Sequence, residues 1–128
     1  MTQEDKELIF KELCARLPYH VKCKIWLKDG TTEEGALDLE HNYGNVLQDS
    51  FYYNQIKDIK PYLFPLSSMT EEEKEEYCQL QQRVIYNSKG VINEDVTKYI
   101  NWCYKKHLDI NNLIPMELAI DATNLNIY

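Results

Sequence analysis

The segment Val21–Lys28 constrains the fold more than any other part of this sequence. Its odd-numbered residues are all apolar, and its even-numbered residues are three lysines and one tryptophan. Successive side chains of a β-strand point to opposite faces, so such a segment is typical of a strand with one buried face. The pair Asp29-Gly30 follows directly and is a strong signal for a tight hairpin turn. We therefore expect an antiparallel hairpin whose first strand carries Val21, Cys23, Ile25 and Leu27 on one face and Lys22, Lys24, Trp26 and Lys28 on the other.

The residues after this turn predict further short strands. Residues 36–40 alternate again on the returning strand, residues 46–47 and 51–53 are short β-prone runs, and Ile56 and Ile59 follow. Several short strands between turn residues are typical of a small antiparallel sheet or an SH3-like barrel. Pro61 and Pro65 bound an apolar stretch, and we expect them to break regular structure and to leave an extended connector over the core.

Three helices are predicted around this β-rich part. Thr2 is a suitable N-cap for a first helix that Pro18 ends, and Thr70 with Glu73 forms a capping box for a second helix that runs to about residue 87. A third helix begins near Asn93 and pairs with the second as an antiparallel hairpin. Residues 109–128 are expected to be irregular and to end in a short helix or strand. The second helix is expected to bury Tyr77, Leu80, Val84 and Ile85.

The order of these elements predicts an α+β fold with an N-terminal helix, a small antiparallel sheet or SH3-like barrel, and a C-terminal helical hairpin packed on it. At 128 residues the chain has the usual size of one domain. We expect a single domain over residues 1–128, β-rich over about 19–66 and helical over about 70–128.

Composition and motif spacing argue against several classes of function. A net charge of −7 disfavours duplex DNA as a partner, since DNA binding needs a cationic surface. No nucleophile elbow, phosphate-binding loop or catalytic pair occurs, so we expect no enzymatic activity and no cofactor. No signal peptide and no membrane-spanning run is found, and we expect a cytoplasmic protein. The cysteines form no metal-binding spacing and are expected to be buried, reduced thiols at positions 14, 23, 78 and 103.

Four short segments carry a resemblance to a known group of proteins. They are RLPY at residues 16–19, KPYLFPLSSMTEEE at 60–73, LIPM at 113–116 and LAIDA at 118–122. With them the chain resembles a widespread group of small uncharacterised proteins encoded by phages, prophages and other mobile elements of anaerobic gut bacteria. The group has no defined activity or binding residue, so the resemblance implies a genomic setting in a bacterial host cell. Short accessory genes in such settings often act against host defence, by sequestering a nucleotide signal or by blocking a host protein.

The polar face of the first strand is the strongest candidate for a binding site. Three lysines flank one tryptophan there, and an indole stacks on a nucleobase while ammonium groups meet phosphates. The alternative is a solvated face that a helix covers, with lysines paired to Glu33, Glu34, Asp38 or Glu40. The candidate ligand-binding residues are Lys22, Lys24, Trp26 and Lys28, with Tyr43, Tyr52 and Tyr53 as added aromatic surface and Lys57 and Lys60 as added positive charge.

Arg16 completes the candidate set, because it lies where the first helix gives way to the sheet. Its guanidinium is suited either to clamping a phosphate or to bridging a helix carboxylate, and the sequence leaves both open. The leading hypothesis is a non-enzymatic, phage-type accessory protein that sequesters a small anionic nucleotide signal of host immunity. The alternatives are a module that blocks a host protein and a binder of single-stranded nucleic acid. A ligand pocket between subunits would require a homo-oligomer.

Overall fold

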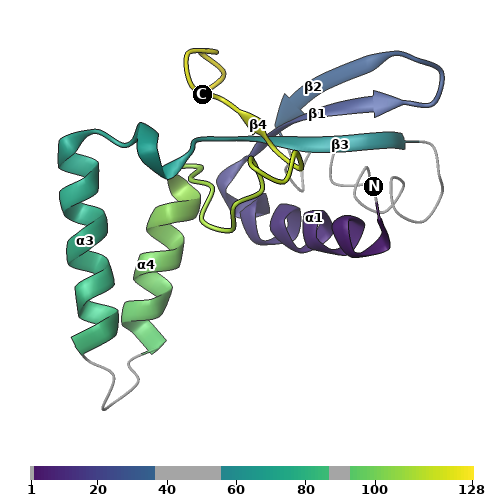
Figure 1. Cartoon of the computed structure of the whole chain (residues 1–128). Coiled ribbons are helices and arrows are strands. Elements are labelled where there is room, and N and C mark those ends of the chain that lie inside the picture. Colours follow the sequence, from purple (N-terminus) through teal and green to yellow (C-terminus); the bar gives the residue numbers. More distant parts are fainter. Residues whose placement is uncertain (1, 37–55, 87–92) are drawn as a thin grey trace.

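The computed structural model of the chain describes residues 2–36, 56–86 and 93–128. They form the expected α+β fold, in which an N-terminal helix and a small sheet are followed by two further helices (Figure 1). The hypotheses about residues 37–55, which include two short strands and the site residues Tyr43 and Tyr52, lie outside the described residues.

Helix α1 (Gln3–Arg16) begins and ends as its sequence predicts. The Thr2 Oγ1 atom accepts a hydrogen bond from the Asp5 backbone N–H at 3.1 Å, and Asp5 Oδ2 accepts one from the Thr2 N–H at 3.1 Å. These two bonds form a capping box that satisfies two backbone donors at the helix start. At the other end the chain tightens into the 3₁₀ turn η1 (Leu17–Tyr19), which contains Pro18.

Four described strands form one sheet in the order β2-β1-β3-β4. Strand β1 (Lys22–Leu27) pairs antiparallel with β2 (Thr32–Ala36) and with β3 (Ile56–Leu63), while β4 (Ile120–Asp121) pairs parallel with β3. The Asp29 carboxylate accepts hydrogen bonds from the Thr31 N–H at 2.8 Å and the Thr31 hydroxyl at 2.6 Å, and Gly30 adopts a φ of 91°. The predicted hairpin turn is confirmed.

Pro61 does not break the chain as expected, because it lies inside β3 opposite Cys23 of β1. A proline fits a strand where its missing N–H is not required by the neighbouring strand. The pairing with β4 begins only at Tyr62, one residue later. The first part of the stretch that we expected to be a connector, residues 61–63, is therefore the end of the strand that joins both parts of the sheet.

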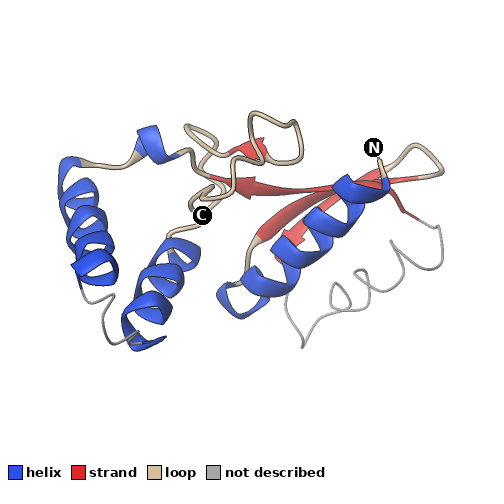
Figure 2. Ribbon diagram, turned by 60° about the horizontal axis from the view of Figure 1, so that its bottom comes forward, coloured by secondary structure: helices blue, strands red, loops and turns tan. Residues whose placement is uncertain are grey.

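The core lies between α1 and the face of the sheet that carries the odd-numbered residues of β1 (Figure 2). Ile9 and Leu13 of α1 pack there against Val21, Cys23 and Ile25, all at 1% exposure or less. The C-terminal segment completes this cluster with Leu113, Leu118 and Ala119. Burial of one face alone is what the strict alternation in β1 predicts.

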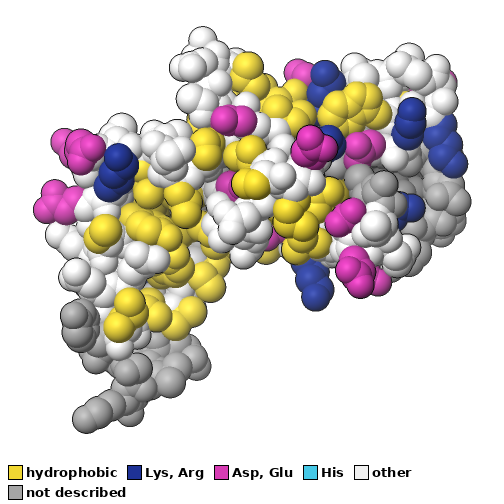
Figure 3. All heavy atoms as spheres, in the orientation of Figure 1, with side chains coloured by type: hydrophobic (Ala, Val, Ile, Leu, Met, Phe, Trp, Pro, Cys, Tyr) yellow, Lys and Arg dark blue, Asp and Glu magenta, His cyan; other side chains and the backbone are white. Residues whose placement is uncertain are grey.

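Helices α3 (Glu71–Tyr86) and α4 (Asn93–Lys105) form the predicted hairpin beside one end of the sheet (Figure 1). The capping box at Thr70 is confirmed, with bonds of 3.0 and 3.1 Å between Thr70 and Glu73. Hydrophobic side chains gather along the two helices (Figure 3). The hydroxyl of Tyr99 donates to that of Tyr77 across the hairpin at 3.0 Å. Ile85, which we expected to be buried, is 65% exposed, because it lies on the outer face of α3.

Two backbone hydrogen bonds attach the hairpin to the end of β3. The Phe64 N–H donates to the His107 carbonyl and the Asp109 N–H donates to the Phe64 carbonyl, each at 2.8 Å. The chain then crosses back to add β4, which is the short terminal strand that the sequence allowed. The 3₁₀ turn η2 (Leu66–Ser68) links β3 to the start of α3.

The four cysteines are free thiols, but only two of them are buried as expected. Cys23 and Cys103 are fully inaccessible, whereas Cys14 and Cys78 are exposed. Cys14 follows Leu13 directly, and neighbouring residues of a helix point about 100° apart. It therefore leaves the core stripe that Ile9 and Leu13 define. Among the described residues no helix is long and apolar enough to cross a membrane.

Candidate functional site

The candidate site is the sheet face opposite α1, and we call it the lysine-tryptophan face. It carries Lys22, Lys24 and Trp26 of β1 and Lys60 of β3, which alternate with the buried core positions. Helix α1 packs against the other face of the sheet (Figure 2). The prediction that a helix covers Trp26 is thus not what the described residues show, and all four side chains are half-buried.

Two ammonium groups lie close to the indole of Trp26. The Lys24 Nζ is 5.4 Å from the centroid of the indole ring and the Lys60 Nζ is 5.8 Å from it. The two lysines are direct cross-strand partners in the β1-β3 register, so the backbone itself sets them side by side. Each contact is worth about 0.5–1 kcal/mol at a site of this exposure. The pair keeps two positive charges next to one aromatic surface.

The Lys22 end of the face is concave. A recess of about 380 Å³ lies between the sheet and the C-terminal segment. The hydroxyl of Tyr62 donates to Glu34 Oε1 at 2.6 Å across its floor, and burial together with this bond raises the pKa of Tyr62 to about 12. The Lys22 ammonium donates to the Ile127 carbonyl. The recess is lined by Lys22, Glu34, Gly35, Tyr62, Leu125, Asn126 and Ile127.

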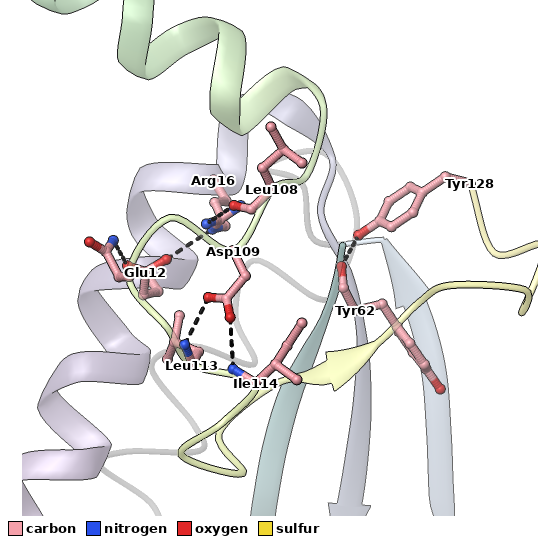
Figure 4. A network of polar contacts seen from close by, with 9 residues as sticks. Glu12, Arg16, Tyr62, Leu108, Asp109, Leu113, Ile114 and Tyr128 are labelled. Carbon is pink, nitrogen blue, oxygen red and sulfur yellow. Dashed lines mark hydrogen bonds and ion pairs between the residues drawn. The ribbon is translucent and has the colours of Figure 1, made fainter. Parts of the chain in front are cut away.

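Tyr128 holds the C-terminal segment over this end of the site. Its hydroxyl donates to the Tyr62 carbonyl at 2.7 Å (Figure 4). The same hydroxyl accepts a hydrogen bond from the Lys22 backbone N–H at 2.9 Å. The Lys22 ammonium lies 5.7 Å from the centroid of the Tyr128 ring. The Lys22 ammonium is thus already bound to the Ile127 carbonyl. The described contacts of the Lys24 and Lys60 ammonium groups are with the Trp26 ring.

Arg16 is not on this face. It is fully buried, and its Nε donates to Glu12 Oε2 at 2.9 Å while its Nη2 donates to the Leu108 carbonyl at 2.7 Å (Figure 4). Asn111 donates to the other oxygen of Glu12, and the Tyr104 ring lies 4.7 Å from the guanidinium carbon. Of the two roles that the sequence left open, the bridge to a helix carboxylate is the one observed. The buried position leaves no access for a phosphate.

Two other predicted site residues lie away from Trp26. Lys28 follows the end of β1 and is exposed at the hairpin turn. Lys57 is exposed on β3 next to Asp58, where the register with β1 shifts from the Trp26–Asp58 pair to the Leu27–Ile56 pair, and this irregularity leaves Lys57 out of the pairing. The structure therefore brings together Lys22, Lys24, Trp26 and Lys60.

Sequence reasoning missed the residues that form the recess. Glu34 was expected only as a partner for lysines, yet it accepts a hydrogen bond from Tyr62, and the C-terminal residues Ile127 and Tyr128 were assigned no role. An excess of tyrosine, ten in the chain, was the one available signal. Within the described part of the chain, no group of three His, Cys, Asp or Glu side chains is arranged to hold a metal ion.

Comparison with known proteins identifies no family model, no curated protein and no solved structure that matches this chain.

Proposed function

We propose that the chain is a non-enzymatic protein that binds a small anionic nucleotide on the lysine-tryptophan face. The observation that carries this proposal is that the Lys24 and Lys60 ammonium groups both lie close to the Trp26 ring centroid, at 5.4 and 5.8 Å. A nucleobase that stacks on the indole gains about 1–3 kcal/mol, and its phosphate then lies near two cations. The resemblance to phage and prophage proteins favours sequestration of a nucleotide signal in the bacterial cytoplasm.

The charge balance favours a small ligand over a long nucleic acid. The chain carries a net charge of −7, which repels an extended polyanion. A small nucleotide brings at most two phosphates to the face, and these would contact Lys24 and Lys60. Glu34 and Asp58 lie on the same face as direct partners of Lys24 and Trp26, and they limit the positive field to the surroundings of the indole.

The test measures the fluorescence of Trp26 itself. In a Trp102→Phe background Trp26 is the only tryptophan. The replacement removes the exposed hydrogen bond from Trp102 to Glu76 and keeps an aromatic ring next to Tyr77 and Lys106. Quenching of the Trp26 fluorescence is then titrated with linear and cyclic mono- and dinucleotides. We expect saturable quenching by at least one of them with a dissociation constant below about 1 mM, which corresponds to about 4 kcal/mol.

Matched variants assign the binding to the face. Trp26→Ala, followed by calorimetry, should weaken binding at least about tenfold, and Lys24→Ala and Lys60→Ala about threefold to tenfold each. Lys98→Ala is the control, because Lys98 is exposed on α4 and pairs with Glu94 at 3.5 Å. The proposal fails if no nucleotide binds below about 1 mM, or if Trp26→Ala binds as tightly as the wild type. Affinity that rises with oligonucleotide length and falls steeply with salt would instead indicate single-stranded nucleic acid.

A further inference from the structure

A second and larger recess lies at the base of the helical hairpin, away from Trp26. Its volume is about 470 Å³, which is in the range of small-molecule sites. It forms where the end of β3, the start of α3, the end of α4 and the C-terminal segment meet. Its walls are partly aromatic and its rim is charged. The side chains that matter here are Phe64, Glu73, Lys105, Lys106, His107 and Tyr128.

His107 occupies a backbone position that normally belongs to glycine. Its φ is 57°, and it follows the last turn of α4. The Leu108 N–H donates to the Cys103 carbonyl and the His107 N–H donates to the Tyr104 carbonyl, each at 3.0 Å. These are the two hydrogen bonds of a Schellman motif, in which glycine is the usual residue at this position. A histidine here carries backbone strain that the helix end does not require.

The His107 imidazole is stacked on a neighbouring ring but is incompletely hydrogen-bonded. Its ring stacks on Tyr128 at a centroid distance of 3.7 Å and an interplanar angle of 13°. Its Nδ1 atom is buried and has no hydrogen-bond partner among the described residues. Burial, and then the positive charges of Arg16 and Lys22, lower the pKa of His107 to about 4, so the ring is neutral near pH 7. A strained residue with an unused polar atom is a feature of binding sites.

The charges at the rim favour an anion. Glu73 is engaged, because its carboxylate accepts from the Thr70 N–H at 3.0 Å and lies 3.7 Å from the Lys106 ammonium. Lys106 also lies 5.9 Å from the Trp102 ring centroid. Lys105 is exposed and makes no ion pair within the described part of the chain. Two lysines against one glutamate leave the rim positive.

We propose that this recess binds a small molecule that carries an oxyanion, a carboxylate or a phosphate, on a planar apolar body. The planar body contacts the aromatic wall of Phe64, His107 and Tyr128, and the oxyanion meets the free ammonium group of Lys105. This site is separate from the lysine-tryptophan face. Tyr128 lines this recess and also contacts Lys22 of that face.

The probe is phenyl phosphate, with benzoate as the carboxylate counterpart, and the measurement is the shift of the His107 ring resonances in proton-carbon NMR spectra. We expect saturable shifts with one or both, and at most weak ones with the neutral analogue benzyl alcohol. His107→Gly suits the left-handed backbone and should weaken binding, measured by calorimetry, about tenfold or more. Lys105→Ala should weaken it about fivefold, in keeping with one lost charge-assisted contact.

The controls match both variants. His20 also has a positive φ, 56°, but it follows η1 and does not line the recess, so His20→Gly should bind the probe as the wild type does. Lys98→Ala controls for Lys105→Ala on the same helix. Trp26→Ala should also leave this binding unchanged, which separates the recess from the lysine-tryptophan face. The proposal is overturned if neither probe gives saturable shifts up to about 10 mM, if benzyl alcohol binds equally well, or if both His107→Gly and Lys105→Ala bind normally.

Discussion

Replacement of Glu12 by alanine should destabilise the fold more than a change at any exposed position of α1. Arg16 is fully buried and Glu12 is 4% exposed, so the variant leaves a guanidinium in the core without its countercharge. The remaining Arg16 contacts are the Leu108 carbonyl and the Tyr104 ring, and neither carries a negative charge. Breaking a buried pair in this way costs about 3–5 kcal/mol, a large fraction of the 5–15 kcal/mol of a typical domain.

Urea denaturation followed by tryptophan fluorescence measures this loss. With a slope of about 2 kcal/mol per molar, the midpoint should fall by about 1.5–2.5 M. The double variant Glu12→Leu/Arg16→Met removes both charges and should lose less free energy of unfolding than Glu12→Ala alone, because no unpaired charge stays buried.

The exposed pair of Glu94 and Lys98 provides the control. It has the same i, i+4 spacing and an N–O distance of 3.5 Å, but Glu94 is 72% exposed. Glu94→Ala should therefore change the free energy of unfolding by only about 0.5 kcal/mol. A loss below about 1 kcal/mol for Glu12→Ala, or a double variant that loses the sum of the single losses, would contradict a stabilising role of the buried Glu12–Arg16 pair.

Two further predictions concern the thiols and the pH dependence of stability. Cys14 and Cys78 should react at once with a thiol reagent in the native state. Cys23 and Cys103 should react only on unfolding, because they are inaccessible and burial also raises their pKa. More or fewer than two fast-reacting thiols would contradict this. Because the pKa of His107 is about 4 in the fold and near 6.5 unfolded, the unfolded chain takes up its proton first as the pH falls. Stability should drop between about pH 6.5 and 4, and His107→Gly should lose less over that range than the wild type; equal losses would show that the imidazole contributes nothing.

The elements that depend on neighbouring residues alone were predictable. Strand β1 followed from strict alternation, its turn from Asp29-Gly30, the start of α1 from the N-cap at Thr2 and the start of α3 from the capping box at Thr70. In each case the deciding contacts lie within a few residues of one another, so the sequence pattern contains the information.

The predictions that were wrong concern residues whose partners lie far away in the sequence. Arg16 is buried because the Leu108 carbonyl, 92 positions later, accepts its hydrogen bond, and no local pattern specifies that partner. A signal did exist: Glu12 and Arg16 share one helical stripe with Ile9 and Leu13, which places both charged residues toward the core. For the candidate site, Lys24 and Trp26 followed from alternation, whereas the choice of Lys60 over Lys57 required the register of β3.

The two hydrogen bonds at Phe64 have a consequence for how the molecule opens. They join residue 64 to residues 107 and 109. The two ends of the segment that carries α3 and α4 are therefore held together next to the end of β3. We therefore expect the hairpin to unfold as a cooperative unit while β1, β2 and β3 remain paired. Amide hydrogen exchange should then be faster in α3 and α4 than at Ile25 and Ile59, with an opening free energy below that of the whole chain.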